Sequence, residues 1–140
     1  MTLTFRYKNI RHPNGSEVKT PSIPITLSGN GGKYDFIALL DSGADVSALP
    51  KGVAELLGLN LQGQHEEASG IGGTVQAVQS KLNLEVGKAH ERYSFSVPVK
   101  VILSEDEFPI LLGRAGFFDK FTIIFSQKDE RVLLKRVTDS

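Results

Sequence analysis

The apolar residues of this chain come in short runs separated by glycine, proline, asparagine and serine, and no long amphipathic pattern joins them. Such runs are typical of β-strands and turns, whereas a helix needs apolar positions three and four residues apart over a longer stretch. We therefore expect an all-β fold with one or two short helices. At 140 residues the chain has the length of one domain, so residues 1–140 are expected to form a single core.

The expected strands share alternating or continuous apolar residues bounded by turn residues. They are 2–7, 23–27, 34–40, 82–86, 93–103, 108–112, 122–125 and 131–137. Asn30-Gly31 is a hairpin signal between the second and third of these segments. Short helices are expected at 51–58, ended by Gly58, and at 115–120.

Charge and composition exclude several classes of function. Lys plus Arg equals Asp plus Glu at 16 each, so no basic surface is indicated and nucleic acid is not an expected partner. The chain has no cysteine and its 3 histidines are isolated from one another, so no metal site is expected. No segment approaches the ~20 apolar residues of a membrane span, and no signal peptide is visible, so we expect a cytoplasmic protein without a membrane partner.

Residues 37–44 read Ile-Ala-Leu-Leu-Asp-Ser-Gly-Ala, an apolar run that stops at Asp41. Asp-Ser-Gly alone is a common turn signal, because Asp and Ser accept backbone hydrogen bonds and Gly adopts positive φ. The unbroken apolar run 36–40 indicates instead a strand buried on both faces, which would deliver Asp41 to an inner surface. A buried carboxylate needs a compensating partner, so Asp41 is a candidate for chemistry.

A second apolar run at 110–112 is followed by Gly113 and Arg114. The guanidinium of Arg114 keeps its charge over the whole pH range of interest. Asp45 lies four residues past Asp41 and would need such a cation if it were partly buried. Two interpretations remain, an ion pair between Arg114 and Asp45 or a surface residue at a helix entry, and we favour the ion pair.

Residues 67–79 are rich in glycine around 69–73 and are flanked by β-prone residues, which predicts a hairpin with a loosely held tip. Such a tip is either a flexible surface turn or a lid over a site. Composition alone favours the surface turn.

These motifs occur in a fixed order: Ala-Leu-Leu-Asp-Ser-Gly-Ala-Asp at 38–45, the helix 51–58, Gly70-Ile71-Gly72-Gly73, and Ile-Leu-Leu-Gly-Arg at 110–114. The ordered set, over roughly residues 20–126, resembles the retropepsin-like aspartic peptidases. The resemblance implies a small closed barrel-like β domain that works as a homodimer, in which each subunit lends one catalytic aspartate. It implies an aspartic endopeptidase that acts without a cofactor on a protein or peptide bound in extended form.

The resemblance also implies a role for each motif residue. The active-site loop comprises the acid/base Asp41, Ser42 bonded across the two-fold axis, Gly43 facing the substrate backbone, Ala44 packed behind them, and Asp45. Asp45 would pair with Arg114 inside one subunit and brace the dimer. Gly70, Ile71, Gly72 and Gly73 would form the tip of a flap that closes over the peptide.

The residues themselves support a second chain. Only one Asp-Ser-Gly occurs here, while hydrolysis by carboxylates needs one group to deprotonate water and another to polarise the carbonyl. The second carboxylate must then come from a partner related by a two-fold axis. Such a pair holds one proton over a window of pH and titrates as a unit, so a bell-shaped activity profile on the acid side is expected.

The two ends of the chain extend beyond the matching motifs. Residues 1–20 are expected to form an extension with a strand or hairpin, and 126–140 a C-terminal strand that is a candidate for the dimer interface. Two alternative functions stay open. One is a catalytically silent retropepsin-fold domain that binds peptides or serves as a scaffold. The other is a magnesium site at Asp41 for phosphoryl transfer, although no phosphate-binding loop accompanies it.

Overall fold

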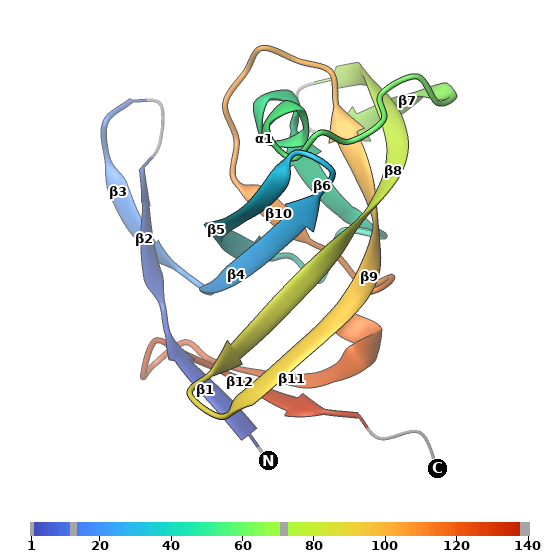
Figure 1. Ribbon diagram of the computed structural model, residues 1–140. Coiled ribbons are helices and arrows are strands. Elements are labelled where there is room, and N and C mark those ends of the chain that lie inside the picture. Colours follow the sequence, from blue (N-terminus) through green and yellow to red (C-terminus); the bar gives the residue numbers. More distant parts are fainter. Residues whose placement is uncertain (1, 12–13, 71–72, 138–140) are drawn as a thin grey trace.

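The computed structural model describes residues 2–11, 14–70 and 73–137, and strands make up most of its elements (Figure 1). In chain order the elements are β1 (Thr2–Arg6), β2 (Lys8–Arg11), β3 (Glu17–Thr20), β4 (Ser22–Gly29), β5 (Gly32–Leu40), β6 (Ser47–Pro50), α1 (Lys51–Leu56), β7 (His65–Gly70), β8 (Gly73–Lys88), β9 (Glu91–Ile102), β10 (Ile110–Leu112), the 3-10 helix η1 (Phe118–Lys120), β11 (Phe121–Ser126) and β12 (Arg131–Arg136). The expected all-β class is therefore confirmed.

The largest sheet closes on itself. Its strands lie in the order β4-β5-β10-β6-β9-β8-β7, and β8 also pairs with β4, so the strands from β4 to β8 form a ring. The closing pairs are Thr26↔Glu85, Leu27↔Leu84 and Ser28↔Asn83. Closure gives β4 a second neighbour and leaves β7 as the edge strand of this sheet, and it gives the barrel-like form that the resemblance implies.

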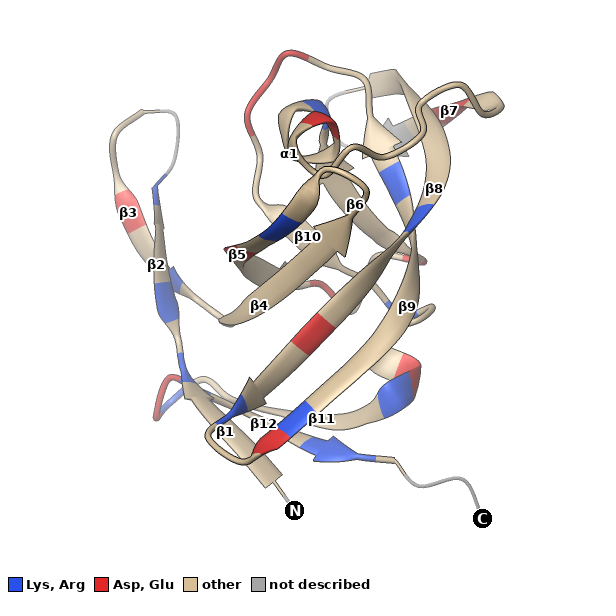
Figure 2. Cartoon of the chain, viewed as in Figure 1, with Lys and Arg blue, Asp and Glu red and all other residues tan. Residues whose placement is uncertain are grey.

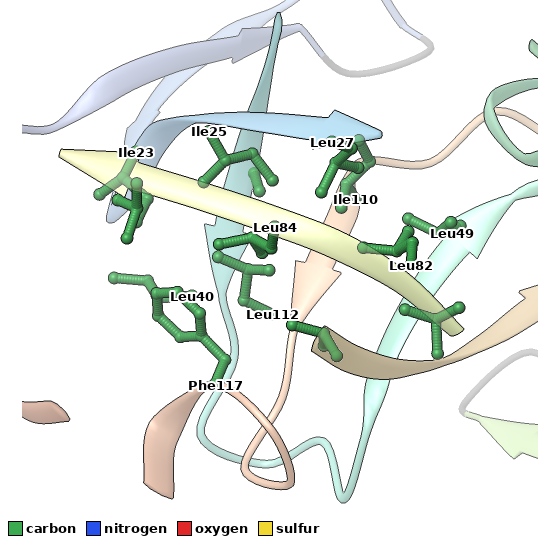
Figure 3. Packing of buried hydrophobic residues seen from close by; sticks show 14 of the residues in the cluster. Ile23, Ile25, Leu27, Leu40, Leu49, Leu82, Leu84, Ile110, Leu112 and Phe117 are labelled. Atoms are coloured by element: carbon green, nitrogen blue, oxygen red, sulfur yellow. The ribbon is translucent and has the colours of Figure 1, made fainter. Parts of the chain in front are cut away.

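Alternate residues of the strands fill the interior of this ring (Figure 3). Ile23, Ile25 and Leu27 of β4 are at most 3% exposed, and Leu84 of β8 packs in the same cluster. Phe117, which is fully buried, belongs to the cluster as well. Fully burying one such side chain contributes roughly 1.5–3 kcal/mol, so this core is the main support for the loops at its rim.

The two ends of the chain form a separate antiparallel sheet with the order β1-β12-β11. Leu3 and Phe5 of β1 face Leu134 and Val132 of β12, and all four side chains are buried. The hairpin of β2 and β3 stands at one side of the barrel (Figure 1). The expected strand and hairpin within residues 1–20 are thus present.

Two local expectations about turns are confirmed, and one about a helix is wrong. Asn30 and Gly31 form the turn of the β4–β5 hairpin, and Gly58 ends α1 with a φ of +67°. The helix expected at 115–120 is reduced to the three residues of η1, because Gly116 has a φ of +86° and interrupts the helical path.

The run 36–40 is not buried on both faces. Ala38 and Leu40 point into the core, whereas Ile37 is 43% exposed and Leu39 is only half-buried. Residues that alternate along a strand face opposite sides, and here one of these sides is uncovered in the single chain. Asp41 continues the uncovered side.

Acidic and basic residues are interspersed along the described chain (Figure 2). On the barrel wall the Glu85 carboxylate lies 3.2 Å from Lys33 of β5 and 3.0 Å from Arg92 of β9. Arg92 and then Lys33 hold the pKa of Glu85 below its ordinary value. No helix in the described part of the chain is long and apolar enough to cross a membrane.

Candidate active site

Asp41 follows the last residue of β5, a strand in the middle of the large sheet. β5 runs parallel to β10, with Leu39 opposite Leu111 and Leu40 opposite Leu112. The backbone N–H of Asp41 donates to the carbonyl oxygen of Leu112 at 3.0 Å. The position of Asp41 is therefore set by a ladder that joins two segments far apart in the sequence.

Beyond Asp41 the chain turns at once. The backbone N–H of Gly43 donates to Oδ1 of Asp41 at 3.0 Å, and the N–H of Ala44 donates to the carbonyl oxygen of Asp41 at 3.1 Å. The first bond is the Asx turn that Asp-Ser-Gly favours, and the second closes a backbone β-turn over the same residues. Asp41 and Ala44 are half-buried, while Ser42 and Gly43 are exposed, so the carboxylate is held by the backbone at a rim open to solvent.

Arg114 holds this turn from the other side. Its backbone N–H donates to the carbonyl oxygen of Ala44 at 2.9 Å, and its Nη1 donates to the carbonyl oxygen of Ser42 at 2.9 Å. Its Nη2 forms an ion pair with Oδ1 of Asp45. The expected ion pair is present, but it is not buried, because the Asp45 side chain is 85% exposed and that of Arg114 is 55% exposed.

A buried serine that the sequence analysis did not single out supports the same region. Oγ of Ser47, which is 1% exposed, accepts a hydrogen bond from the N–H of Gly113 at 3.0 Å. A Cβ on Gly113 would lie 2.5 Å from the carbonyl carbon of Val46, so two backbones approach here too closely for any side chain. No local pattern marks Ser47; only the pairing of distant strands reveals its role.

A groove of about 750 Å³ lies beside this loop. Its lining comes from the loop and β6, from β7 and β8, and from the segment after β9: Gly43, Ala44, Asp45, Val46, Ala48, Glu67, Ala68, Gly73, Val75, Lys100, Ile102, Asp106, Phe108 and Leu111. The hairpin of β7 and β8 thus faces the Asp41 loop across a space. The lining contains both apolar and charged residues, so the groove can offer a ligand both kinds of contact.

The glycine-rich hairpin is present as expected, with Gly70 paired to Gly73 across its end. Gly73 has a φ of +112° and lines the groove. Ile71 and Gly72, the other two residues of the expected flap tip, lie outside the described residues. The stem of the hairpin therefore forms one wall of the groove.

A second cavity of about 580 Å³ lies next to the groove and shares one residue with it, Phe108. Its other walls are β2, Thr20, the uncovered side of β5 and the segment 107–109. Ile37 and Leu39, four and two residues before Asp41 on the same side of the strand, form part of its apolar lining. None of the expected site residues that the structure describes lines this cavity.

Comparisons with known proteins agree on one family and one fold. Residues 23–115 match the family model described as aspartyl protease. The fold is similar to that of a retropepsin-like aspartic protease from Rickettsia conorii, with a TM-score of 0.60 and 18% identity over 96% of this chain and 91% of that one. It is also similar to the retroviral protease-like domain of Ddi1 from Leishmania major, with a TM-score of 0.50 and 15% identity over 86% of this chain and 96% of that one. A search of curated proteins gives no match.

Proposed function

The chain belongs to the aspartyl protease family, since that family's model matches residues 23–115, and on this premise we propose that it is an aspartic endopeptidase that works as a homodimer. Residues 1–140 would act as one retropepsin-like domain per subunit. The observation that carries the proposal is the Asp41 turn: the N–H of Gly43 holds the strand-end carboxylate, Arg114 holds the carbonyl oxygen of Ser42, and Gly43 and Ala44 of the same turn line a groove.

Catalysis would need two copies of this turn. One carboxylate takes a proton from water while the other, protonated, donates to the carbonyl oxygen of the scissile bond. Each chain has a single Asp-Ser-Gly, so a two-fold axis beside Asp41 would bring it against Asp41 of the partner subunit. The exposure of Ser42 and Gly43 in one chain fits a loop that is covered in the dimer, where the Ser42 hydroxyl would bond across the axis.

The groove would hold the substrate as an extended strand. Its walls are the Asp41 loop on one side and the β7–β8 hairpin on the other, which is the arrangement needed for a peptide that pairs with backbone on both sides. Gly70, Ile71, Gly72 and Gly73 would then serve as the flap that closes over it. Gly43, whose nearest contact for an added Cβ is Oδ1 of Asp41 at 3.3 Å, leaves room for the peptide backbone.

The exposed pair of Asp45 and Arg114 would have a positioning role. In one chain an exposed ion pair contributes only about 0–1 kcal/mol, so stability alone does not account for it. Its guanidinium also holds the Ser42 carbonyl, which fixes the loop that carries Asp41. We expect the pair to gain strength where a second subunit excludes water from it.

The deciding experiment compares wild type, Asp41→Asn and Asp35→Asn on a mixed peptide pool between roughly pH 4 and 7, with product mapping by mass spectrometry. Asp35 is a matched control, because it is an exposed aspartate on β5, the strand that leads to Asp41, and it accepts a hydrogen bond from Thr26 at 2.7 Å. The proposal expects cleavage by wild type and Asp35→Asn and none by Asp41→Asn, with a bell-shaped pH profile.

Other outcomes separate the alternatives. Undiminished cleavage by Asp41→Asn would rule out the assigned chemistry. A wild-type dimer that cleaves nothing over this pH range would favour the silent peptide-binding domain. Cleavage that survives the addition of a chelator would remove the phosphoryl-transfer alternative, which needs a magnesium ion at Asp41.

A further inference from the structure

The zero net charge of the chain is the total of two unlike parts. Residues 22–114, which contain the barrel and the candidate active site, carry 11 acidic and 7 basic residues. The chain ends, residues 1–21 and 115–140, carry 5 acidic and 9 basic residues. An excess of basic residues in one part of a chain favours a negatively charged partner for that part, whatever the overall balance.

The sheet of β1, β12 and β11, which we call the sheet of chain ends, has a buried face and an outer face. Alternate residues of β1 and β12 are buried, and the residues between them point outward. The register of the three strands places nine outward residues in three rows, and none of the nine is acidic. The charged members of this outer face are Arg6, Arg131 and Lys135, its apolar members are Leu133 and Ile124, and the other four residues carry hydroxyl groups.

The three cations of the outer face are not neutralised within the described part of the chain. No ion pair there includes Arg6, Arg131 or Lys135. Arg6 lies directly opposite Arg131 in the pairing of β1 with β12. Like charges in directly opposite positions destabilise a sheet, so a bound anion would relieve a repulsion that the single chain contains.

The rim of the outer face does not reverse its sign. Nζ of Lys88 donates a hydrogen bond to the carbonyl oxygen of Thr4 at the edge of β1. In the turn after β11, Oδ2 of Asp129 accepts a hydrogen bond from Oγ of Ser126 at 3.2 Å, and Lys128 precedes Asp129 in the chain. Of these three rim charges only Asp129 is negative, so the outer face as a whole remains positive.

The shape of the outer face favours a flat partner. None of its residues lines the three described cavities of about 580, 230 and 750 Å³. It also has no aromatic side chain on which a nucleic-acid base could stack. Its middle row holds the half-buried Leu133 beside Ile124, which is 50% exposed, and the cations lie in the rows on either side. Exposed apolar side chains and nearby cations are the two features that attract a protein surface to anionic lipid headgroups.

We propose that the outer face of the sheet of chain ends binds the surface of a membrane that contains anionic lipids. Arg6, Arg131 and Lys135 would contact lipid phosphate and carboxylate groups, to which a guanidinium offers paired donors. Ile124 and Leu133 would enter the headgroup region. The expectation of no membrane partner concerned a segment that spans a bilayer, and binding to the surface needs no such segment.

Binding through this face would leave the wall of the groove accessible. The sheet of chain ends lies at one end of the molecule, whereas α1 and β7 lie at the other end (Figure 1). Residues of β7 line the groove beside the Asp41 loop. A chain bound to lipid through its outer face would therefore direct β7 away from the membrane. The inference does not depend on cleavage of a peptide.

The test is cosedimentation of the full chain with vesicles of phosphatidylcholine alone and of phosphatidylcholine with about 30% phosphatidylserine. Three cations near an anionic surface, each contributing about fivefold, predict roughly 100-fold stronger partitioning to the anionic vesicles. The double variant Arg6→Gln, Arg131→Gln should lower this partitioning roughly 25-fold. The matched control is Lys51→Gln, Lys81→Gln, which changes the net charge equally but outside the outer face, and it should partition like wild type.

Urea unfolding shows whether a loss of binding has a structural cause. The double variant Arg6→Gln, Arg131→Gln removes a like-charge contact, so it should unfold at the same urea concentration as wild type or at a higher one. Equal partitioning of wild type to both kinds of vesicle, a lack of binding, or a double variant that partitions like wild type would overturn the proposal. An inactive protein that binds anionic vesicles in this way would support the inference and count against the proposed function.

A second arm separates a lipid surface from other polyanions. Binding of fluorescently labelled duplex DNA and of poly-glutamate is measured at the same salt concentration as the vesicle assay, because screening weakens all three interactions. Tighter binding to anionic vesicles than to either polymer, compared at equal concentrations of anionic groups, supports the proposal. Tighter binding to either polymer overturns it and identifies a nucleic acid or an acidic polypeptide as the partner of this face.

Discussion

Arg114 donates a hydrogen bond to the carbonyl oxygen of Ser42, 72 positions earlier in the chain, over 2.9 Å. The guanidinium thereby holds the backbone of the turn that presents Asp41, while its other nitrogen pairs with Asp45. A planar guanidinium directs two different nitrogens at these two acceptors in a fixed geometry, whereas an ammonium group is a single point charge on a flexible stem. The Arg114 side chain thus has two roles, the hydrogen bond to Ser42 and the ion pair with Asp45, and substitutions can test them separately.

Arg114→Lys should lower the unfolding free energy by about 1 kcal/mol or less, because both contacts are exposed. It should lower kcat/KM by roughly 10- to 100-fold, since a small displacement of Asp41 misaligns the reacting groups. Denaturant unfolding and peptide hydrolysis measure the two effects. Asp45→Asn is the matched control, because it removes the ion pair and leaves the bond to Ser42. Equal activity losses in both variants would show that the ion pair, and not the carbonyl bond, positions the loop.

Two glycines should respond to alanine in opposite ways. Gly113→Ala places a Cβ 2.5 Å from backbone atoms of Val46, so we expect a loss of about 2 kcal/mol or more in stability and poor expression. Gly43→Ala meets only Oδ1 of Asp41 at 3.3 Å, so stability should change by less than about 1 kcal/mol. Peptide hydrolysis by Gly43→Ala should nevertheless fall, because the methyl group occupies the space left for the substrate backbone. A Gly43→Ala variant with wild-type KM and kcat would contradict this role.

Glu85 should make stability depend on pH. Arg92 and Lys33 lower the pKa of its carboxyl in the folded state, so its contribution is complete above about pH 4.3, the ordinary value for a glutamate, and is lost as the pH falls through the lowered value. Glu85→Gln should therefore be less stable than wild type near neutral pH, and the difference should shrink on acidification and in high salt.

Urea unfolding of wild type and Glu85→Gln at several pH values measures this difference. Glu55→Gln, an exposed residue of α1, is the control and should track wild type throughout. A difference between Glu85→Gln and wild type that stays constant down to strongly acidic pH would contradict the assignment. The result also bears on the peptidase assay, because acidic conditions would weaken this part of the barrel wall.

The parts of the fold that follow local rules could be predicted. Alternating apolar residues located β1, β4, β8 and β12, and Asn30-Gly31 marked a hairpin turn by its dihedral preference. A strand or hairpin is predicted within residues 1–20, but the bounds of β2 and β3 are not, because these strands are mostly exposed and their apolar residues do not alternate. β6 was missed because it is four residues long and is defined by pairing with β9 and β10, which no local pattern records.

The candidate site could be predicted only in part, because some of its residues follow local motifs and others are defined by the pairing of distant strands. The motif order suggested Asp41 and Arg114, but their approach depends on the parallel pairing of β5 with β10. Ser47 was missed, since a serine beside a short strand has many possible roles until its partner, Gly113, is known. The burial of 36–40 was overstated because a continuous apolar run does not show whether its second side is covered by the chain itself or by something that binds to it.

β8 is one unbroken strand of 16 residues, about 50 Å long in extended form. At its start Gly73 lines the groove, and at its end Lys88 holds the edge of β1. Tension on the hairpin would thus travel along a single backbone to the sheet of chain ends, so the hairpin beside the groove and that sheet are mechanically in series.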